Sequence, residues 1–144
     1  MTGLSSMILD EYISADDFLF LFKSVGWTAP SIEQIQIALQ NTTKSFILKV
    51  NGQPIAMINL LGDFGMHWLL KEFVVHPDYQ GKMIGTMLFL FAENYVKSTL
   101  EDGWKVAITL RSSNGKEKFY KKLGFYECTH KNVGNGMEKI IICK

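Results

Sequence analysis

The first forty residues carry apolar positions spaced for one strand and two helices. Residues 6–13 alternate imperfectly between apolar and polar side chains, as a half-buried strand does. Ser14 and Ser31 each precede an apolar pattern with helical spacing, and serine is a residue type that caps helix N-termini. Gly26 is expected to end the first helix. We therefore predict a strand and two helices before the main part of the sheet.

A hairpin of two strands follows, and its turn is a strong local signal. Residues 45–50 and 54–61 are apolar runs joined by Asn51-Gly52. This dipeptide favours the two-residue turn whose positive φ angles match the twist of paired strands. After a second turn, residues 66–75 become apolar on both faces towards their C-terminal end, which is typical of a central strand covered on both sides.

The second half of the chain continues the alternation of helices and strands. The pattern predicts helices over 84–99 and 115–123, a strand over 104–110, and strands 125–130 and 137–143 paired through a turn at 132–136. This order favours an α/β fold with a mixed, mostly antiparallel, twisted sheet of about six or seven strands and helices on both faces. We expect residues 1–144 to form a single domain.

Composition narrows the classes of function. A chain of 144 residues with 47% apolar and 20% charged residues is typical of one globular domain. The net charge of +1 argues against a nucleic-acid partner, and no apolar run reaches the roughly 20 residues of a membrane span. Cys128 and Cys143 lack ligand spacing or a secretory leader, which favours reduced thiols in the cytoplasm. His67 and His76 stand alone, so we expect no metal.

The segment between the strand at 66–75 and the next helix is suited to binding an anion. The first N–H groups of a helix have no intrahelical partner, and the aligned peptide dipoles place about +0.5 charge there. No acidic residue occurs from Gln80 to Leu90. We therefore expect the open amides to bind a phosphorylated ligand, and they belong to Gly81, Lys82, Met83, Ile84, Gly85 and Thr86.

Two blocks of sequence resemble the GNAT family of N-acetyltransferases. The run from Val75 to Gly85 is similar to the acyl-CoA signature Gln/Arg-x-x-Gly-x-Gly/Ala. Asn114, followed by residues 119–125 (Phe-Tyr-Lys-Lys-Leu-Gly-Phe), is similar to a second block of the same family. Met83 departs from the pattern, because the family normally has glycine there. The resemblance implies the GNAT-like fold, with acetyl-CoA as the acyl donor.

The resemblance also implies roles for residues of both blocks. The main chain at Phe73, Val74 and Val75 would pair with the pantetheine arm, while Gln80 and Lys82 could contact phosphate. Phe119 belongs to the second block, and Asn114 either orients the pantetheine arm or caps the following helix. Tyr120 would be the general acid that protonates the leaving thiolate, because a phenol with a pKa near 10 stays protonated at neutral pH. The alternative for Tyr120 is an ordinary packing role.

The general base and the acceptor site are less specified. The acceptor amine could lose its proton to Glu72, to a chain of waters or to bulk solvent. Many family members carry an acidic residue one position earlier, where this chain has Lys71. Recognition of an amine with an apolar body is assigned to the aromatic and acidic residues near the predicted site, with core packing as the alternative for the tryptophans; these residues are Trp27, Asp63, Phe64 and Trp68.

The predicted function is transfer of an acetyl group from acetyl-CoA to a primary amine, with a small molecule favoured as acceptor. One alternative is an acyl-CoA sensor without turnover, and another is an acetyltransferase that modifies protein lysines or N-termini. Motifs of Rossmann and P-loop nucleotide binders do not occur in the sequence. By analogy with relatives, exposed strand edges and the C-terminal hairpin could form a homodimer.

Overall fold

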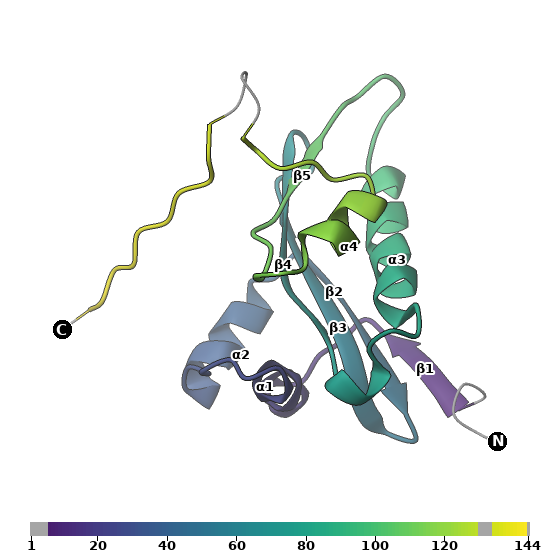
Figure 1. The fold of residues 1–144 in the computed structure, drawn as a ribbon, viewed down its shortest axis with the longest axis vertical. Helices are drawn as coiled ribbons and strands as arrows, with labels where there is room; N and C mark the ends of the chain where they lie inside the picture. The colour runs from purple at the N-terminus through teal and green to yellow at the C-terminus, as the bar shows by residue number, and fades with distance from the viewer. Residues whose placement is uncertain (1–5, 130–133, 144) are drawn as a thin grey trace. The chain divides into compact units, whose positions relative to one another are not determined.

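The structure, a computed structural model, describes residues 6–129 and 134–143. They belong to two compact units, residues 1–110 and 111–144. The elements of the first unit are β1 (Met7–Asp10), α1 (Ala15–Ser24), α2 (Ile32–Gln40), β2 (Lys44–Val50), β3 (Gln53–Gly62), β4 (His67–Val75), the 3-10 helix η2 (Pro77–Tyr79), α3 (Ile84–Ser98) and β5 (Ala107–Thr109) (Figure 1). The second unit contains α4 (Glu117–Lys122).

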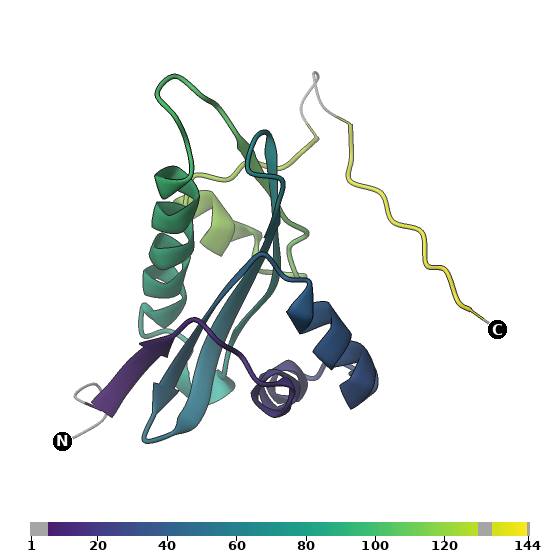
Figure 2. The same cartoon turned by 180° about the vertical axis from the view of Figure 1, so that it is seen from behind.

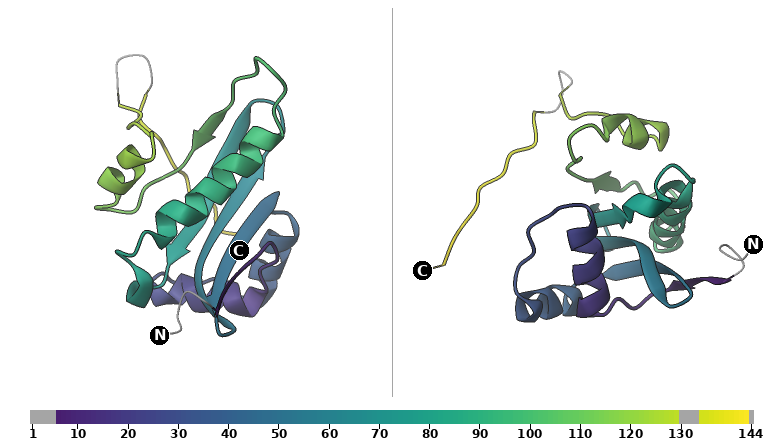
Figure 3. Two further views of the ribbon diagram at one scale, coloured as in Figure 1. Left: turned by 90° about the vertical axis from the view of Figure 1, so that its right-hand side faces the viewer. Right: turned by 60° about the horizontal axis from the view of Figure 1, so that its bottom comes forward.

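The five strands of the first unit form one sheet in the order β1-β2-β3-β4-β5. Successive strands from β1 to β4 pair antiparallel, and β5 pairs parallel to β4. The helices α1 and α2 lie on one face of this sheet and α3 lies on the other (Figures 2 and 3). The predicted mixed α/β fold with helices on both faces is confirmed, with five strands in the described residues instead of six or seven.

Local sequence signals account for the ends of several elements. The Ser14 and Ser31 hydroxyls accept hydrogen bonds from the N–H groups of residues three positions later, at 3.1 and 3.2 Å. Each bond satisfies an N–H that has no partner within the helix. At the β2–β3 turn, Asn51 and Gly52 have φ angles of 51° and 79°. The predicted caps and hairpin turn are therefore confirmed.

Each face of the sheet contributes to a separate half of the core. On the α1 and α2 face, a buried cluster is made by Ile13, Phe18, Leu21, Ile35, Ile47, Met57 and Val74. On the α3 face, the ring of Tyr95 lies edge-on to Phe46 and to Trp68, with centroid distances of 6.5 and 5.8 Å. A Cβ added at Gly62 would lie 2.2 Å from the Trp68 ring, so glycine is required there for close packing.

The predicted C-terminal hairpin is wrong within the described residues. Residues 125–129 and 134–143 form no strand, and the predicted turn at 132–136 lies partly outside the described residues. Ile140, Ile141 and Ile142 are 70–83% exposed. Their β-branched side chains suggested a strand, but β-propensity depends on cross-strand packing that these residues do not make. The predicted homodimer therefore rests on the exposed strand edges and no longer on this hairpin.

Candidate functional site

The connection from β4 to α3 has the backbone geometry of an anion site. Its N-cap residue makes no side-chain capping bond, and the first turn of α3 contains no acidic residue. The N–H groups of Ile84, Gly85 and Thr86 lie in the first turn, where they have no partner within the helix, and Met83 supplies no side-chain cap. Gly81 and Met83 have φ angles of 77° and 65°. Positive φ angles close together can turn backbone N–H groups into a concave site for an anion.

Side chains of the same loop have mainly structural contacts. The Gln80 side-chain amide donates to the Val75 carbonyl at 2.8 Å, which ties the loop to the end of β4. The Nδ1 of His76 accepts a hydrogen bond from the N–H of Asp78 at 3.1 Å. Lys82 Nζ lies 5.5 Å from the centre of the Tyr79 ring, and Lys82 remains exposed. The loop is thus braced from within and leaves its lysine at the surface.

The backbone conformation at Met83 favours glycine, which the family normally has at this position. Its φ of 65° lies in the left-handed region, where a Cβ is unfavourable and glycine is not. The side chain is 71% exposed, so it points into solvent rather than into the core. The departure from the family pattern therefore places backbone strain at the residue just before α3.

Replacement of Met83 by glycine is expected to stabilise the protein. Relief of the left-handed strain should exceed the entropy that glycine adds to the unfolded chain, for a net gain of up to about 1 kcal/mol in the free energy of unfolding. Urea denaturation measures this gain. The matched control is Met87→Gly inside α3, which should cost about 1 kcal/mol. Acetyl-CoA binding by calorimetry should tighten slightly for Met83→Gly, and a large loss of affinity would contradict this account of the loop.

Strand β4 contains a bulge at Glu72. Met57 of β3 pairs with Val74, whereas Asn59 pairs with Lys71, so two steps along β3 face three steps along β4. Glu72 has a φ of 34°, outside the range of a regular strand. An extra residue exchanges the two faces of a strand. Accordingly Trp68 packs against α3, whereas Val74 belongs to the cluster beneath α1 and α2.

The ladder between β4 and β5 ends well before β4 does. The pairs run from His67 with Ala107 to Leu69 with Thr109, where β5 ends, while β4 continues to Val75. The edge of β4 beyond Leu69 therefore has no strand of β5 beside it. The predicted pantetheine-binding stretch 73–75 lies beyond the end of this ladder. An extended ligand can add to such an edge through main-chain hydrogen bonds.

A small cavity of about 150 Å³ adjoins the bulge. Lys71 and Glu72 both line it, although adjacent residues of a regular strand point to opposite faces. Their side chains form an ion pair at 2.9 Å and are 17% and 27% exposed. The remaining lining comes from α1, α2 and the segment between them, and consists of Phe18, Phe22, Pro30, Gln34, Ile35 and Ala38. The cavity thus joins a mostly apolar wall to one carboxylate and one ammonium group.

The four residues predicted to recognise the acceptor lie in different surroundings. Trp27 contacts Phe22 edge-on at 5.0 Å and packs against the cluster beneath α1 and α2. Trp68 is 1% exposed on the opposite face of the sheet, with the Phe64 ring edge-on at 5.2 Å. Because Trp27 and Trp68 lie on opposite faces, they do not line one acceptor pocket.

Asp63, the fourth of these residues, organises the turn between β3 and β4. Its Oδ1 accepts hydrogen bonds from the N–H groups of Gly65, Met66 and His67 at 2.9, 2.7 and 3.0 Å. These bonds, of which that from His67 has the largest effect, lower the pKa of the Asp63 carboxyl to about 2. The negative charge of Asp63 is therefore stabilised by backbone N–H groups of its own turn.

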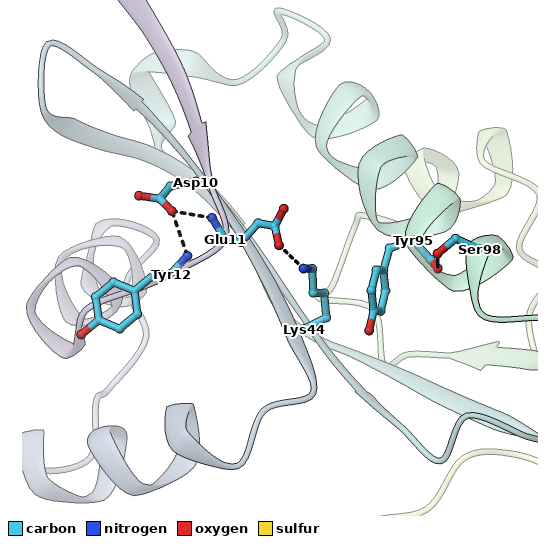
Figure 4. Close-up of polar contacts among 6 residues, drawn as sticks. All are labelled: Asp10, Glu11, Tyr12, Lys44, Tyr95 and Ser98. Atoms are coloured by element: carbon cyan, nitrogen blue, oxygen red, sulfur yellow. Dashed lines mark hydrogen bonds and ion pairs between the residues drawn. The ribbon is translucent and has the colours of Figure 1, made fainter.

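A larger, open groove of about 690 Å³ lies between α2, β2 and the segment before α1. Glu11 forms an ion pair with Lys44 at its wall, and Lys44 Nζ also lies 4.9 Å from the centre of the Tyr95 ring (Figure 4). The ion pair joins the segment after β1 to the first residue of β2. Neither Glu72 nor the β4–α3 loop lines the groove, so we do not assign it to the reaction.

In the second unit, Tyr120 lies within α4 between two aromatic rings. Phe119 and Phe125 contact it edge-on, with centroid distances of 5.2 and 5.8 Å. Burial raises the pKa of Tyr120 to about 12. The N-cap of α4 is Lys116, without a side-chain capping bond, so the alternative that Asn114 caps this helix is wrong.

The described residues also bear on metal sites and membrane spans. No group of three or more His, Cys, Asp or Glu residues lies close enough together to hold a metal ion within 6–129 and 134–143. No helix in this part of the chain has both the length and the apolar character to cross a membrane.

Comparison with known proteins gives concordant matches. Residues 41–127 match the family model for the acetyltransferase (GNAT) domain. An uncharacterized N-acetyltransferase, ycf52, of Pyropia yezoensis is 29% identical over 126 residues, covering 81% of this chain and 70% of the relative. Its counterpart from Gracilaria tenuistipitata var. liui is 30% identical over 120 residues, covering 81% of this chain and 64% of the relative, so the chain spans about two thirds of these curated relatives.

The fold has solved counterparts as well. A probable acetyltransferase of unknown function from meticillin-resistant Staphylococcus aureus superposes with a TM-score of 0.81 and 21% identity. The match covers 93% of this chain and 99% of that protein. At this level of identity the likeness shows a shared fold.

Proposed function

The chain belongs to the GNAT acetyltransferase family, and on this premise we propose that it transfers an acetyl group from acetyl-CoA to the primary amine of a small molecule. The observation that carries the proposal is the element formed by the part of β4 beyond its ladder with β5, the loop from His76 to Met83 and the uncapped start of α3. A coenzyme with an extended arm and a diphosphate matches both halves of this element. The arm would pair with residues 73–75, and the diphosphate would lie against the N–H groups of 81–86.

The cavity at the bulge is the proposed site for the acceptor. Its apolar wall suits the carbon body of a small amine, and the Glu72 carboxylate suits the ammonium end. The volume of about 150 Å³ favours a small head group over a folded protein surface. Modification of a protein lysine or N-terminus is the alternative for the same cavity, because a single side chain or chain end could also enter it.

The proposed reaction is direct transfer, with no covalent intermediate on the protein. The amine loses a proton to Glu72 or to water, and its nitrogen then attacks the thioester carbonyl carbon. The N–H groups of the opened β4 edge would stabilise the oxyanion, and collapse of the tetrahedral species breaks the C–S bond. The amide nitrogen releases its remaining extra proton to solvent. The thiolate takes its proton from the Tyr120 hydroxyl, and solvent then reprotonates the tyrosine.

A non-catalytic acyl-CoA sensor is the second candidate. The observation in its favour is the Lys71–Glu72 ion pair, because the Lys71 ammonium already occupies the carboxylate that the acceptor ammonium would contact. A sensor would bind the coenzyme without releasing thiol from it.

Three statements stay predictions from the sequence: a homodimer through exposed strand edges, a cytoplasmic location and a single domain over 1–144.

The test of the proposed function combines binding with turnover. Calorimetry with CoA and acetyl-CoA should give measurable heat, and thermal unfolding should shift upward with either ligand. Thiol release from acetyl-CoA is then followed with a panel of amines of different size and polarity. Release above the background rate supports the enzyme, and binding without release supports the sensor. Neither heat nor thermal protection at millimolar coenzyme would contradict both.

A further inference from the structure

Among the described residues, one polar residue, Asn59 in β3, is fully buried, with 0% exposure. Both ends of its side-chain amide are used. The Asn59 Oδ1 accepts a hydrogen bond from the Ser45 hydroxyl at 2.7 Å, and the Asn59 Nδ2 donates to the Glu72 carbonyl at 3.1 Å. Ser45 and Asn59 are direct partners in the β2–β3 ladder. A single chain of hydrogen bonds thus runs across three strands and ends at the bulge.

The cost of burying an amide indicates that this contact is specific. Met57, two residues earlier in β3 and on the same face as Asn59, is 0% exposed, so an apolar residue at position 59 would match its surroundings. A buried amide is tolerated only when its donor and acceptor are both bonded. At a bulge the strand ladder is locally disrupted, and its backbone groups need other partners. Asn59 supplies such a partner to the Glu72 carbonyl.

We propose that Asn59, oriented by Ser45, is a positioning residue that fixes the β4 bulge and thereby aims the Glu72 carboxylate into the small cavity. The inference rests on the proposed function, since it assigns Asn59 to the same site. The Glu72 carbonyl can only accept, so it requires the nitrogen end of the amide, and the Ser45 hydroxyl donates to the oxygen end and holds the amide in that orientation. The amide nitrogen then holds the carbonyl of a residue whose φ of 34° is otherwise unfavourable.

The variants separate this role from general loss of packing. Asn59→Leu keeps the size of the side chain but removes both hydrogen bonds. Ser45→Ala removes only the orienting hydroxyl and is the milder change if Asn59→Leu does not fold. The matched control is Thr43→Val, because the Thr43 Oγ1 also crosses between these strands, accepting from the Gly62 N–H at 3.0 Å, but has no link to the bulge.

Steady-state rates give the first measurement. At saturating substrates, kcat should fall about tenfold or more for Asn59→Leu and about threefold for Ser45→Ala, with KM for acetyl-CoA changing by less than about threefold. Thr43→Val should retain the rate of the parent protein. In a Glu72→Gln background, Asn59→Leu should cause less than about a twofold further loss, because its effect acts through Glu72. Folded variants with an unchanged kcat, or fully additive losses, would overturn the inference.

Hydrogen exchange gives a measurement that does not require activity. The amides of residues 72–75 should exchange faster in Ser45→Ala than in the parent protein, whereas Thr43→Val should leave them unchanged. Unchanged exchange in Ser45→Ala would overturn the role of the hydrogen-bond chain. If the parent protein neither binds nor turns over acetyl-CoA, the proposed function fails, and the exchange data alone decide whether Asn59 holds the bulge.

Discussion

Replacement of Tyr120 by phenylalanine is expected to lower kcat by about 100-fold, because the departing thiolate would lose its proton donor. The substitution removes one oxygen and keeps the ring that lies between Phe119 and Phe125. Folding and acetyl-CoA affinity should therefore change little. Initial rates of thiol release at saturating substrates measure kcat, and calorimetry measures affinity.

The pKa of Tyr120 gives this prediction a pH dependence. With a pKa of about 12, the hydroxyl stays protonated across the range in which the enzyme can be assayed. A proton donor is lost only as the pH rises through its pKa. The parent protein should therefore show no decline in kcat below about pH 10 that depends on Tyr120.

The matched control is Tyr126→Phe, since Tyr126 belongs to the same unit and its side chain is 70% exposed. This variant should keep the kcat of the parent protein. A Tyr120→Phe protein with unchanged kcat on the true acceptor would remove Tyr120 from the mechanism and would favour the packing role that its two aromatic contacts also allow.

Replacement of Glu72 by glutamine should lower kcat/KM for the amine by about 10- to 100-fold at neutral pH. The change removes the base and the negative charge proposed to attract the ammonium group. Because glutamate and glutamine are both unfavourable at a φ of 34°, the substitution leaves the backbone strain of the bulge unchanged. The loss should shrink as the assay pH approaches the amine pKa, near 10, where the acceptor is already deprotonated.

Kinetics over pH 7 to about 10 measure this effect. Glu93→Gln on α3 is the control for removing a carboxylate from an ion pair, because Glu93 pairs with Lys97 at 3.8 Å away from the cavity. It should leave kcat/KM unchanged. A loss for Glu72→Gln that stays constant with pH would contradict both roles, because each requires an ammonium group on the acceptor, and no loss at all would remove Glu72 from the site.

Features fixed by neighbouring residues were predictable from the sequence. The Asn51-Gly52 turn and the serine caps depend on short-range geometry, and the structure has them where the pattern places them. The strand, loop and helix around residues 66–98 were predictable for the same reason. Their apolar periods are long and their boundaries carry clear turn residues.

The features that depend on contacts between strands were not predictable in this way. The bulge at Glu72 leaves no mark in the sequence of β4, because the residues before Lys71-Glu72 and after it are apolar at consecutive positions and show no alternation that an extra residue would shift. Asn59 gave the available signal, since it interrupts an otherwise apolar run from Ile55 to Leu61. Three of the four residues predicted to bind the acceptor are aromatic, and core packing requires the same property, as the burial of Trp68 illustrates.

The bulge also has a consequence for how this part of the chain can vary. With one residue fewer between Lys71 and Val74, the alternation would restart, and Val74 would turn from the α1 and α2 layer towards α3. The hydrophobic character of the segment would survive such a deletion, but both layers would have to repack. Substitutions along the end of β4 should therefore be tolerated better than insertions or deletions of one residue.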